Sequence, residues 1–341
     1  MVNHGVSTNA QERHPINTQA TNWHILGAGA MGCLWAAKIW QHARSCVELP
    51  SSTQPACFLL RDAAALAHWQ RVGGVIVHSK GVQTLIPVNA VTIADASPTA
   101  INNLLLCTKA QDALPALQSV AHLLHAESRV VLIQNGTKAQ QAIAEHFPTL
   151  ALFCLSTSHG AYLTGAYEVV HAGQGKTYLG PMKPELVLPS AEQSRLLSSL
   201  ASESMNIHWD TNITDRLWTK FAINCAINAL TVIYDCRNGE LLNIPAAASE
   251  LDELCGEIES IMNTVAASPQ PLALFSKVLA VLEATAQNYS STLQDVRKSR
   301  PTEIAYFNAY LCELARKANR DCPLNDAVLR RFNAIAQHDS D

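Results

Sequence analysis

Three polar side chains recur at four-residue intervals in an otherwise apolar stretch of the sequence. Lys220, Asn224 and Asn228 lie in the segment WTKFAINCAIN, which occupies residues 218–228. This spacing places the three side chains along one face of a helix. An amine and two amides within an apolar helix are costly to bury unless each finds a hydrogen-bonding partner. A polar ligand in a cleft between domains would supply such partners. A solvated helix face is the alternative interpretation.

A glycine-rich segment near the N-terminus has the spacing of a dinucleotide-binding turn. It follows an apolar strand expected over residues 23–26 and precedes residues that favour a helix. Glycines at this spacing permit a tight turn, close approach of the backbone to a pyrophosphate, and close packing of helix on strand. The free N–H groups at the start of the helix attract phosphate. The candidate cofactor-binding residues are Gly27, Ala28, Gly29, Ala30, Met31 and Gly32. A glycine-rich turn without a ligand is the alternative.

The end of the second expected strand, over residues 57–60, indicates which dinucleotide is bound. An acidic residue at this point binds the ribose hydroxyls of NAD, whereas an arginine suits the 2′-phosphate of NADP. Arg61 comes first and Asp62 follows, so we predict NADPH and NADP+. The interval from Gly32 exceeds the usual length of about 20 residues, and we assign the excess to an insertion at residues 43–55. A surface salt bridge is the alternative role of Arg61.

The order of apolar segments predicts two domains of different class. Short apolar strands alternate with helices, and β-like segments punctuated by glycines follow between residues 151 and 180. This alternation is typical of a parallel α/β sheet. From residue 215 onward nearly every segment has helical periodicity, including a single helix expected over residues 302–318. We predict a Rossmann-type α/β N-terminal domain followed by an all-α C-terminal domain. The expected ranges are 1–22 for a disordered extension, 23–210 for the NADP-binding domain and 211–338 for the helical domain.

Composition excludes several classes of protein. The chain has 341 residues, a net charge of -4 and no cluster of Lys and Arg, which argues against a nucleic-acid partner. Its uninterrupted apolar stretches are too short to cross a membrane. Ten cysteines without a C-x-x-C pair, and thirteen histidines without ligand spacing, predict reduced core thiols and no metal site. The polar N-terminus lacks the apolar region of a signal peptide, so we expect a cytoplasmic protein.

Six segments of the sequence resemble the ketopantoate reductase family. They are LGAGAMGCLW (26–35), LLCTKAQ (105–111), LIQNG (132–136), LWTKFAINCAINALTVIYDCRNG (217–239), YSSTLQDVRKSRPTEIAY (289–306) and NRDCPLN (319–325). They occur in the family's order and span both expected domains. The resemblance implies NADPH-dependent reduction of 2-dehydropantoate to (R)-pantoate, for the synthesis of pantothenate. It implies a small-molecule 2-oxo acid as the partner, with no nucleic acid and no membrane.

The resemblance also assigns roles to individual residues. Lys220 is expected to be the general acid that protonates the ketone oxygen, and Glu303 to bind the substrate hydroxyl and help position that lysine. The residues expected to contact the carboxylate and other oxygen atoms of the substrate are Asn224, Asn228 and Ser291. Asn135, also a substrate contact, and Lys109 are expected near the nicotinamide and its ribose.

Each of these roles has a simpler structural alternative. Glu303 follows a proline, so it could lie in the first turn of a helix, where an acidic residue is favoured. Ser291 could cap a helix, Asn135 could belong to a strand-end turn, and Lys109 could be a solvated loop residue.

Other functions remain open at this stage. Ala305 and Ala229 depart from the family pattern, and leave open a reductase of another branched 2-oxo acid. A non-catalytic NADP(H)-sensing protein on the same fold is a further alternative, although a sensor needs no proton donor. A dehydrogenase of the hydroxyacid or glycerol-phosphate type lacks support from the lysine and glutamate motifs. The sequence leaves the choice between monomer and homodimer open.

Overall fold

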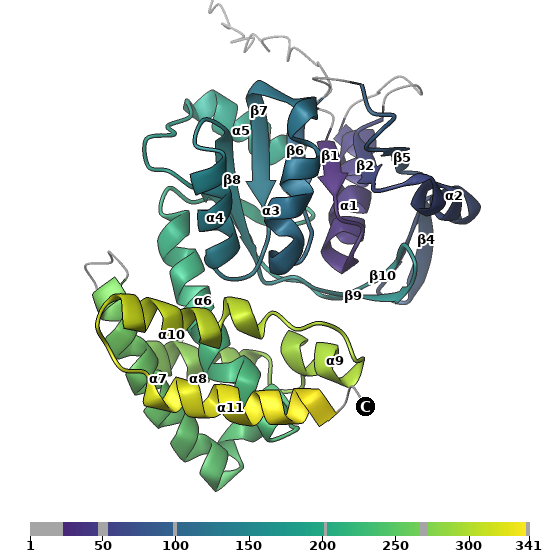
Figure 1. The fold of residues 1–341 in the computed structure, drawn as a ribbon. Coiled ribbons are helices and arrows are strands. Elements are labelled where there is room, and N and C mark those ends of the chain that lie inside the picture. Colours follow the sequence, from purple (N-terminus) through teal and green to yellow (C-terminus); the bar gives the residue numbers. More distant parts are fainter. Residues whose placement is uncertain (1–22, 47–53, 98–100, 201–202, 266–271, 339–341) are drawn as a thin grey trace, which may run out of the picture.

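The computed structural model describes residues 23–46, 54–97, 101–200, 203–265 and 272–338 (Figure 1). The extension expected at residues 1–22 lies outside these ranges. So does most of the insertion expected at 43–55, whose first residues continue a helix instead. None of the described helices is long and apolar enough to span a membrane.

The described elements form one α/β unit followed by one helical unit. The strands are β1 (Trp23–Leu26), β2 (Ala56–Leu60), β3 (Val75–Ser79), β4 (Val82–Ile86), β5 (Asn89–Thr92), β6 (Ile101–Leu106), β7 (Leu124–Leu132), β8 (Ala151–Thr157), β9 (Gly160–Gly165), β10 (Glu168–Gly173), β11 (Thr177–Pro181) and β12 (Ile207–Trp209). The α-helices are α1 (Ala30–Cys46), α2 (Ala63–Val72), α3 (Ala110–Ser119), α4 (Lys138–His146), α5 (Ser190–Ser199), α6 (Ile213–Ile233), α7 (Pro245–Val265), α8 (Leu274–Ala284), α9 (Ser291–Arg297), α10 (Asn308–Lys317) and α11 (Pro323–His338). Short 3-10 helices are η1 (Ala121–Leu123), η2 (Asn238–Leu242) and η3 (Ile304–Tyr306).

The main sheet has the strand order β12-β11-β8-β7-β6-β1-β2-β5. Strands β8, β7, β6, β1, β2 and β5 are parallel to one another, and β11 pairs with β8 in the antiparallel direction. The chain leaves β1 toward β2 on one side and later returns to β6 on the other side. The carboxyl ends of β1 and β6 therefore lie together where the strand order reverses, which is the place where α/β sheets of this kind bind ligands.

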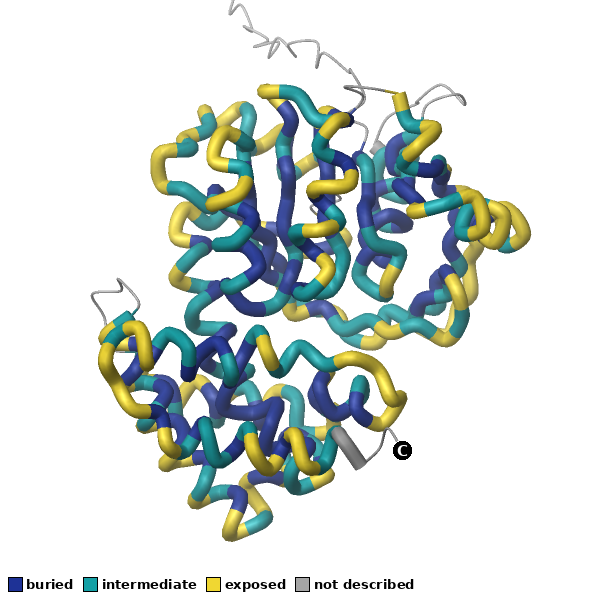
Figure 2. The backbone as a smooth tube through the Cα atoms, viewed as in Figure 1, coloured by how far each residue is buried: buried dark blue, intermediate teal, exposed yellow. Residues whose placement is uncertain are grey.

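Apolar layers cover both faces of the main sheet. One face packs against α1, α2 and α5, and its core includes Trp23, Phe58 and Leu196. The opposite face packs against α3, α4 and the first turns of α6, with Leu104, Ile143 and Leu217 in that core. The strands are buried in the centre of the domain, as the tube in Figure 2 shows. Strands buried on both faces explain the continuous apolar runs in the sequence.

A second, four-stranded sheet covers α1 on its outer side. Its order is β4-β3-β10-β9, and α1 contacts all four of its strands as well as β1 and β2. In Figure 1, β9 and β10 run along the edge of this unit that faces the helical unit. Helix α1 is thus enclosed between two sheets, which fixes the direction of its N-terminus.

The helical unit is built around α6. Its central residues, among them Phe221, Cys225 and Ala229, are fully buried and pack against α7, α8, α9, α10 and α11. The first turn of α6 instead packs under the main sheet through Ile213 and Leu217. One continuous helix therefore joins the two apolar cores, as Figure 1 shows.

The predicted fold class is confirmed, and the differences concern particular elements. The sequence analysis did not identify β5, β9, α4 or the C-terminal helix α11. The single helix expected over residues 302–318 is wrong, because the chain forms η3 and α10 with a non-helical residue, Phe307 (φ -116, ψ -103), between them. The physical reason is tertiary: Phe307 is fully buried, and the carbonyl oxygen of Tyr306 lies against the backbone of Gly136.

Two glycines in helices give a matched test of this packing. A Cβ on Gly32 would lie 1.9 Å from the carbonyl oxygen of Gly27, whereas a Cβ on Gly256 in α7 meets nothing within 4 Å. We expect Gly32→Ala to lower the free energy of unfolding by about 3 kcal/mol, because backbone must move. Gly256→Ala should raise the free energy of unfolding by about 1 kcal/mol, because alanine has a higher helix propensity than glycine at this exposed position. Urea unfolding of both variants measures these changes, and equal stabilities would contradict the turn geometry.

Candidate active site

Helix α6 carries the three polar residues to the junction between the two units. Lys220 and Asn224 are partly buried and Asn228 is 6 % exposed, so the alternative of a solvated helix face is wrong. Within the described ranges, the side-chain amides of Asn224 and Asn228 form no hydrogen bond, and neither amide is completely shielded from solvent. Two unpaired amides therefore lie one and two turns beyond Lys220 on its own helix face.

The amine of Lys220 is held against the sheet. Its Nζ donates a hydrogen bond to the carbonyl oxygen of Thr157, at the end of β8, over 2.9 Å. Burial lowers the pKa of Lys220 from 10.5 to about 8, and the charge of Glu303 opposes this shift only in part. Desolvation disfavours the ammonium form, so proton release and uptake become feasible near neutral pH.

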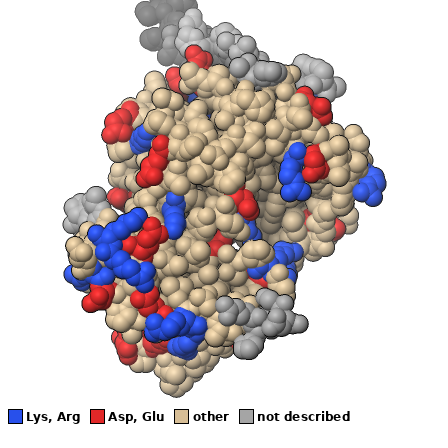
Figure 3. All heavy atoms as spheres, in the orientation of Figure 1, with Lys and Arg blue, Asp and Glu red and all other residues tan. Residues whose placement is uncertain are grey.

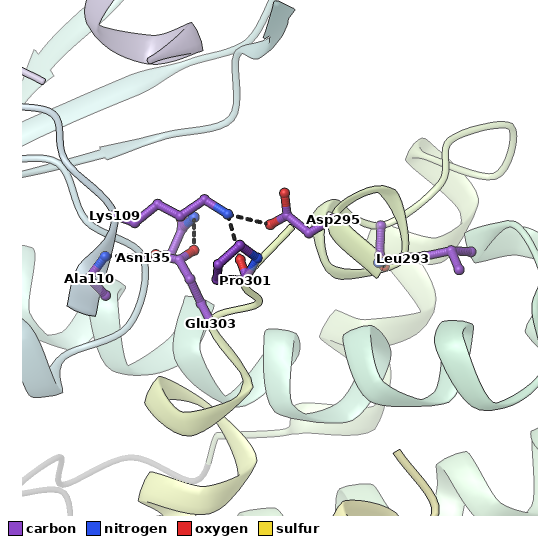
Figure 4. Close-up of polar contacts among 8 residues, drawn as sticks. Lys109, Ala110, Asn135, Leu293, Asp295, Pro301 and Glu303 are labelled. Carbon is purple, nitrogen blue, oxygen red and sulfur yellow. Dashed lines mark hydrogen bonds and ion pairs between the residues drawn. The ribbon is translucent and has the colours of Figure 1, made fainter. Parts of the chain in front are cut away.

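Glu303 lies between the two units. One carboxylate oxygen accepts a hydrogen bond from the backbone N–H of Ala110 over 2.9 Å, and the other accepts one from Nδ2 of Asn135 over 3.5 Å (Figure 4). Burial raises the pKa of Glu303, and these two hydrogen bonds oppose the rise. Glu303 does lie at the N-cap of the short helix η3, as the alternative expected, but its side chain forms no hydrogen bond there. Its charge instead faces the N-terminus of α3 in the other unit.

Lys109 bridges the two units on the same side. Its Nζ donates to Oδ2 of Asp295 over 2.8 Å and to the carbonyl oxygen of Pro301 over 2.7 Å, as Figure 4 shows. The alternative of a solvated loop lysine is therefore wrong. Asn135 follows β7 and lies beside Lys109 and Glu303. The strand ends of the α/β unit thus face the loop before η3.

The sequence analysis missed Asp295 and the carbonyl of Thr157. Asp295 lies one turn after Ser291 on α9, so the four-residue spacing could have identified it. A backbone carbonyl leaves no signal in the sequence, and only the fold places it beside Lys220.

Ser291 is exposed and is the first residue of α9. The alternative that Ser291 caps this helix is wrong, because the cap is Ser290. The Ser290 hydroxyl accepts a hydrogen bond from the backbone N–H of Leu293 and is bonded to the hydroxyl of Thr231. The spacing of four places Ser291 on the same face of α9 as Asp295, which faces Lys109.

The glycine-rich turn fits a dinucleotide for reasons that differ at each glycine. Gly27 has φ +107 and lies directly against the backbone of Thr108, while Gly32 packs on Gly27. Gly29 has neither constraint: its φ is ordinary and a Cβ there would meet nothing within 4 Å. The space over Gly29 is free, at the N-terminus of α1, where backbone N–H groups favour a pyrophosphate. Ala28, Ala30 and Met31 are only partly buried beside it.

Arg61 extends from the end of β2. Its side chain is 91 % exposed and its Nε pairs with Oδ2 of Asp62 over 3.1 Å, so the salt bridge considered as an alternative is present. The other carboxylate oxygen of Asp62 accepts from the N–H of Ala65 and caps α2. The guanidinium of Arg61 is thus the more exposed of the two charged groups at this strand end.

The surface around these elements carries both signs of charge. On the face shown in Figure 3, acidic and basic side chains lie intermixed over both units. An ion pair between α4 and α10 also joins the units, because Lys138 pairs with Glu313 over 2.6 Å. The two units therefore contact each other through polar groups as well as through α6.

Known proteins resemble the chain over most of its length. A curated 2-dehydropantoate 2-reductase of Vibrio cholerae is 29% identical over 317 residues, which cover 92% of this chain and 97% of that protein. The crystal structure of a probable 2-dehydropantoate 2-reductase from Bacillus subtilis matches with a TM-score of 0.75 at 21% identity, over 92% of this chain and 99% of the other. A ternary structure of D-mandelate dehydrogenase with NADH and anilino(oxo)acetate matches with a TM-score of 0.79 at 20% identity, over 94% and 99%.

Two family models cover most of the sequence. The model described as "Ketopantoate reductase PanE/ApbA" matches residues 23–184, and the model of its C-terminal part matches residues 212–336. The first match contains the glycine-rich turn and Lys109, and the second contains Lys220 and Glu303. The chain belongs to the ketopantoate reductase family.

Proposed function

We propose that this protein uses NADPH to reduce 2-dehydropantoate to (R)-pantoate. The observation that carries the proposal is the desolvated amine of Lys220, placed between the units together with the carboxylate of Glu303. Residues 23–210 hold the cofactor, and residues 211–338 supply the proton donor and most substrate contacts. Family membership supports the same reaction class.

The cofactor is held at the carboxyl ends of β1, β2 and β6. The backbone of residues 27–32 receives the pyrophosphate over the open position at Gly29, and Arg61 pairs with the ribose 2′-phosphate. Lys109 and Asn135 contact the nicotinamide ribose from the ends of β6 and β7. Bound NADPH supplies a hydride to the ketone carbon of the substrate.

Lys220 supplies the proton that the reduction requires. A ketone that accepts a hydride becomes an alkoxide unless a proton reaches its oxygen, and a positioned ammonium delivers one. Thr157 accepts one N–H of Lys220 through its carbonyl and so fixes the direction of the amine. A pKa of about 8 keeps most of the amine protonated at neutral pH while making it a better acid than an ordinary lysine.

The remaining polar groups hold the substrate. Asn224 and Asn228 offer unpaired amides for the carboxylate, and Ser291 adds a hydroxyl from α9. Glu303 accepts a hydrogen bond from the substrate hydroxyl. Its negative charge also favours the protonated form of Lys220. A protein that only sensed NADP(H) would gain nothing from a buried amine, since its desolvation is costly.

The loss of the nicotinamide absorbance of NADPH in the presence of 2-dehydropantoate tests this proposal. We expect Lys220→Ala to lower kcat on the order of a hundredfold or more, because the proton donor is removed. Lys277→Ala, at an exposed lysine of α8, is the matched control and should retain wild-type turnover. Turnover of other branched 2-oxo acids without turnover of 2-dehydropantoate would refute the substrate and leave the reaction class intact.

The lowered pKa of Lys220 predicts opposite pH profiles for the two directions of the reaction. Reduction needs the ammonium form, so its rate should fall as the pH rises through about 8. Oxidation of pantoate by NADP+ needs the neutral amine, so its rate should rise over the same range. Initial rates from pH 6 to pH 10 measure both, with about pH 8 as the expected common midpoint. Parallel profiles in the two directions would exclude Lys220 as the acid and base.

Arg61 should determine the preference for NADPH over NADH. A charge-assisted contact to a phosphate contributes about 1.5–3 kcal/mol, so Arg61→Ala should raise KM for NADPH roughly ten- to a hundredfold. The KM for NADH should change little, because NADH has no 2′-phosphate. Arg71→Ala, at an exposed arginine of α2, is the control. Equal effects on both cofactors would show that Arg61 acts only through its ion pair with Asp62.

A further inference from the structure

A second cluster of reactive side chains lies in the helical unit, apart from the residues proposed for the reaction. Cys312 belongs to α10, Cys322 directly precedes α11, and Asp326 lies in the first turn of α11. The two sulfur atoms and a carboxylate oxygen all lie within 4.8 Å of one another. Nine residues separate the two cysteines in the sequence, and only the turn between α10 and α11 brings them together.

The two oxygens of the Asp326 carboxylate accept hydrogen bonds from different partners. Its Oδ1 accepts a hydrogen bond from Arg316 over 2.7 Å on the exposed side. Its Oδ2 accepts the Sγ–H of Cys322 over 3.7 Å on the buried side. Cys312 and Cys322 are only 1 % and 3 % exposed. Arg316 therefore orients the carboxylate so that its inner oxygen faces both thiols.

This arrangement matches the coordination geometry of a thiophilic cation. Zinc–sulfur bonds of about 2.3 Å in a tetrahedral site place two sulfur ligands about 3.8 Å apart. The observed separation of 3.7 Å between Sγ of Cys322 and Oδ2 of Asp326 is already close to such a spacing. Only small side-chain movements are needed to place the three atoms around one ion.

Acidic side chains lie around the two thiols. The carboxylate of Asp326 lies close to both sulfur atoms. Glu257, whose carboxylate binds the first N–H groups of α11, adds negative charge near Cys322. A divalent cation takes the place of the thiol protons and is attracted by the negative charge of the carboxylates.

We propose that Cys312, Cys322 and Asp326 form a binding site for a thiophilic divalent cation, with Zn²⁺ as the ion that fits best. Two thiolates and one carboxylate bind the ion, and a water molecule completes the tetrahedron. Binding releases two protons, one from each thiol. The three ligands and the ion carry a net charge of -1, which Arg316 balances from the outer oxygen of Asp326.

The site would stabilise the contact between the two units. Helix α10, which carries Cys312, also carries Tyr310 and Glu313. Tyr310 donates a hydrogen bond to Gln141 on α4, and Glu313 pairs with Lys138 on the same helix. An ion that ties the middle of α10 to the start of α11 therefore restrains the helix that faces the α/β unit. This role is structural and independent of the proposed reaction.

Equilibrium dialysis of the full chain against Zn²⁺ tests the site. The protein is reduced, treated with a chelator and prepared without an affinity tag. We expect one zinc ion per chain, release of two protons in weakly buffered solution, and binding that tightens as the pH rises. Co²⁺ in place of Zn²⁺ should give the near-ultraviolet absorption of a sulfur-to-cobalt charge transfer. Bound Zn²⁺ should also raise the melting temperature.

Three variants distinguish this site from other thiols of the chain. The double variant Cys312→Ser with Cys322→Ser should lose zinc binding, and Asp326→Asn should weaken it at least tenfold. Cys255→Ser removes a buried thiol of α7 that also has acidic neighbours, and should bind zinc like the wild type. Asp326→Asn leaves both thiols in the core, and circular dichroism verifies that it remains folded.

Three outcomes would overturn the proposal. The first is a folded, reduced chain that binds no zinc, and the second is zinc binding that survives in both site variants. The third is formation of a disulfide between Cys312 and Cys322 on treatment with peroxide, with loss of one hydrogen from each thiol, in a protein that binds no zinc when reduced. That result would assign the pair to disulfide chemistry instead.

Discussion

The amine of Lys220 is removed from water at the point where α6 passes from beneath the main sheet into the helical unit. Its single protein partner among the described residues is the carbonyl of Thr157. An ammonium group is unfavourable in such surroundings, and the lowered pKa expresses that cost. The cost is sustained because α6 is anchored on both sides of Lys220, by Leu217 in the core under the sheet and by Phe221 in the helical core. A helix fixed in this way cannot turn the lysine toward solvent.

Several of the other contacts between the two units are polar. Glu303 faces the N-terminus of α3, Lys109 pairs with Asp295, and Lys138 pairs with Glu313. The large apolar cores remain within their own units, apart from the α6 crossing and Tyr306 of η3, which packs against the core under the sheet. Polar contacts between units can be exchanged for contacts with a ligand at small net cost, because charged groups keep partners in both states. The residues that bridge the units are therefore suited to hold a substrate between them.

The glycine-rich turn shows how packing and binding requirements can be separated. Gly27 and Gly32 are required by the fold itself, since each approaches backbone too closely for a side chain. Gly29 is required by nothing within the described structure. A glycine at this open position, beside the N-terminus of α1, is consistent with the close approach of a phosphate group. The same reasoning applies to the amides of Asn224 and Asn228, which are buried on one side and unpaired on the other.

The sequence by itself determined the fold class, the order of the domains and the helix face that carries Lys220, because these follow from the periodicity of apolar residues along short segments. The glycine turn and Glu303 were also identifiable, from spacing and from the family resemblance. The sequence could not show the break at Phe307, the cap at Ser290, or the approach of Asp295 to Lys109. It could not show that Cys312 and Cys322 lie close together either. Each of these depends on contacts between segments far apart in the chain, or on a helix boundary that neighbouring elements decide. The periodicity of apolar residues along a segment does not depend on such contacts, so only the tertiary structure determined them.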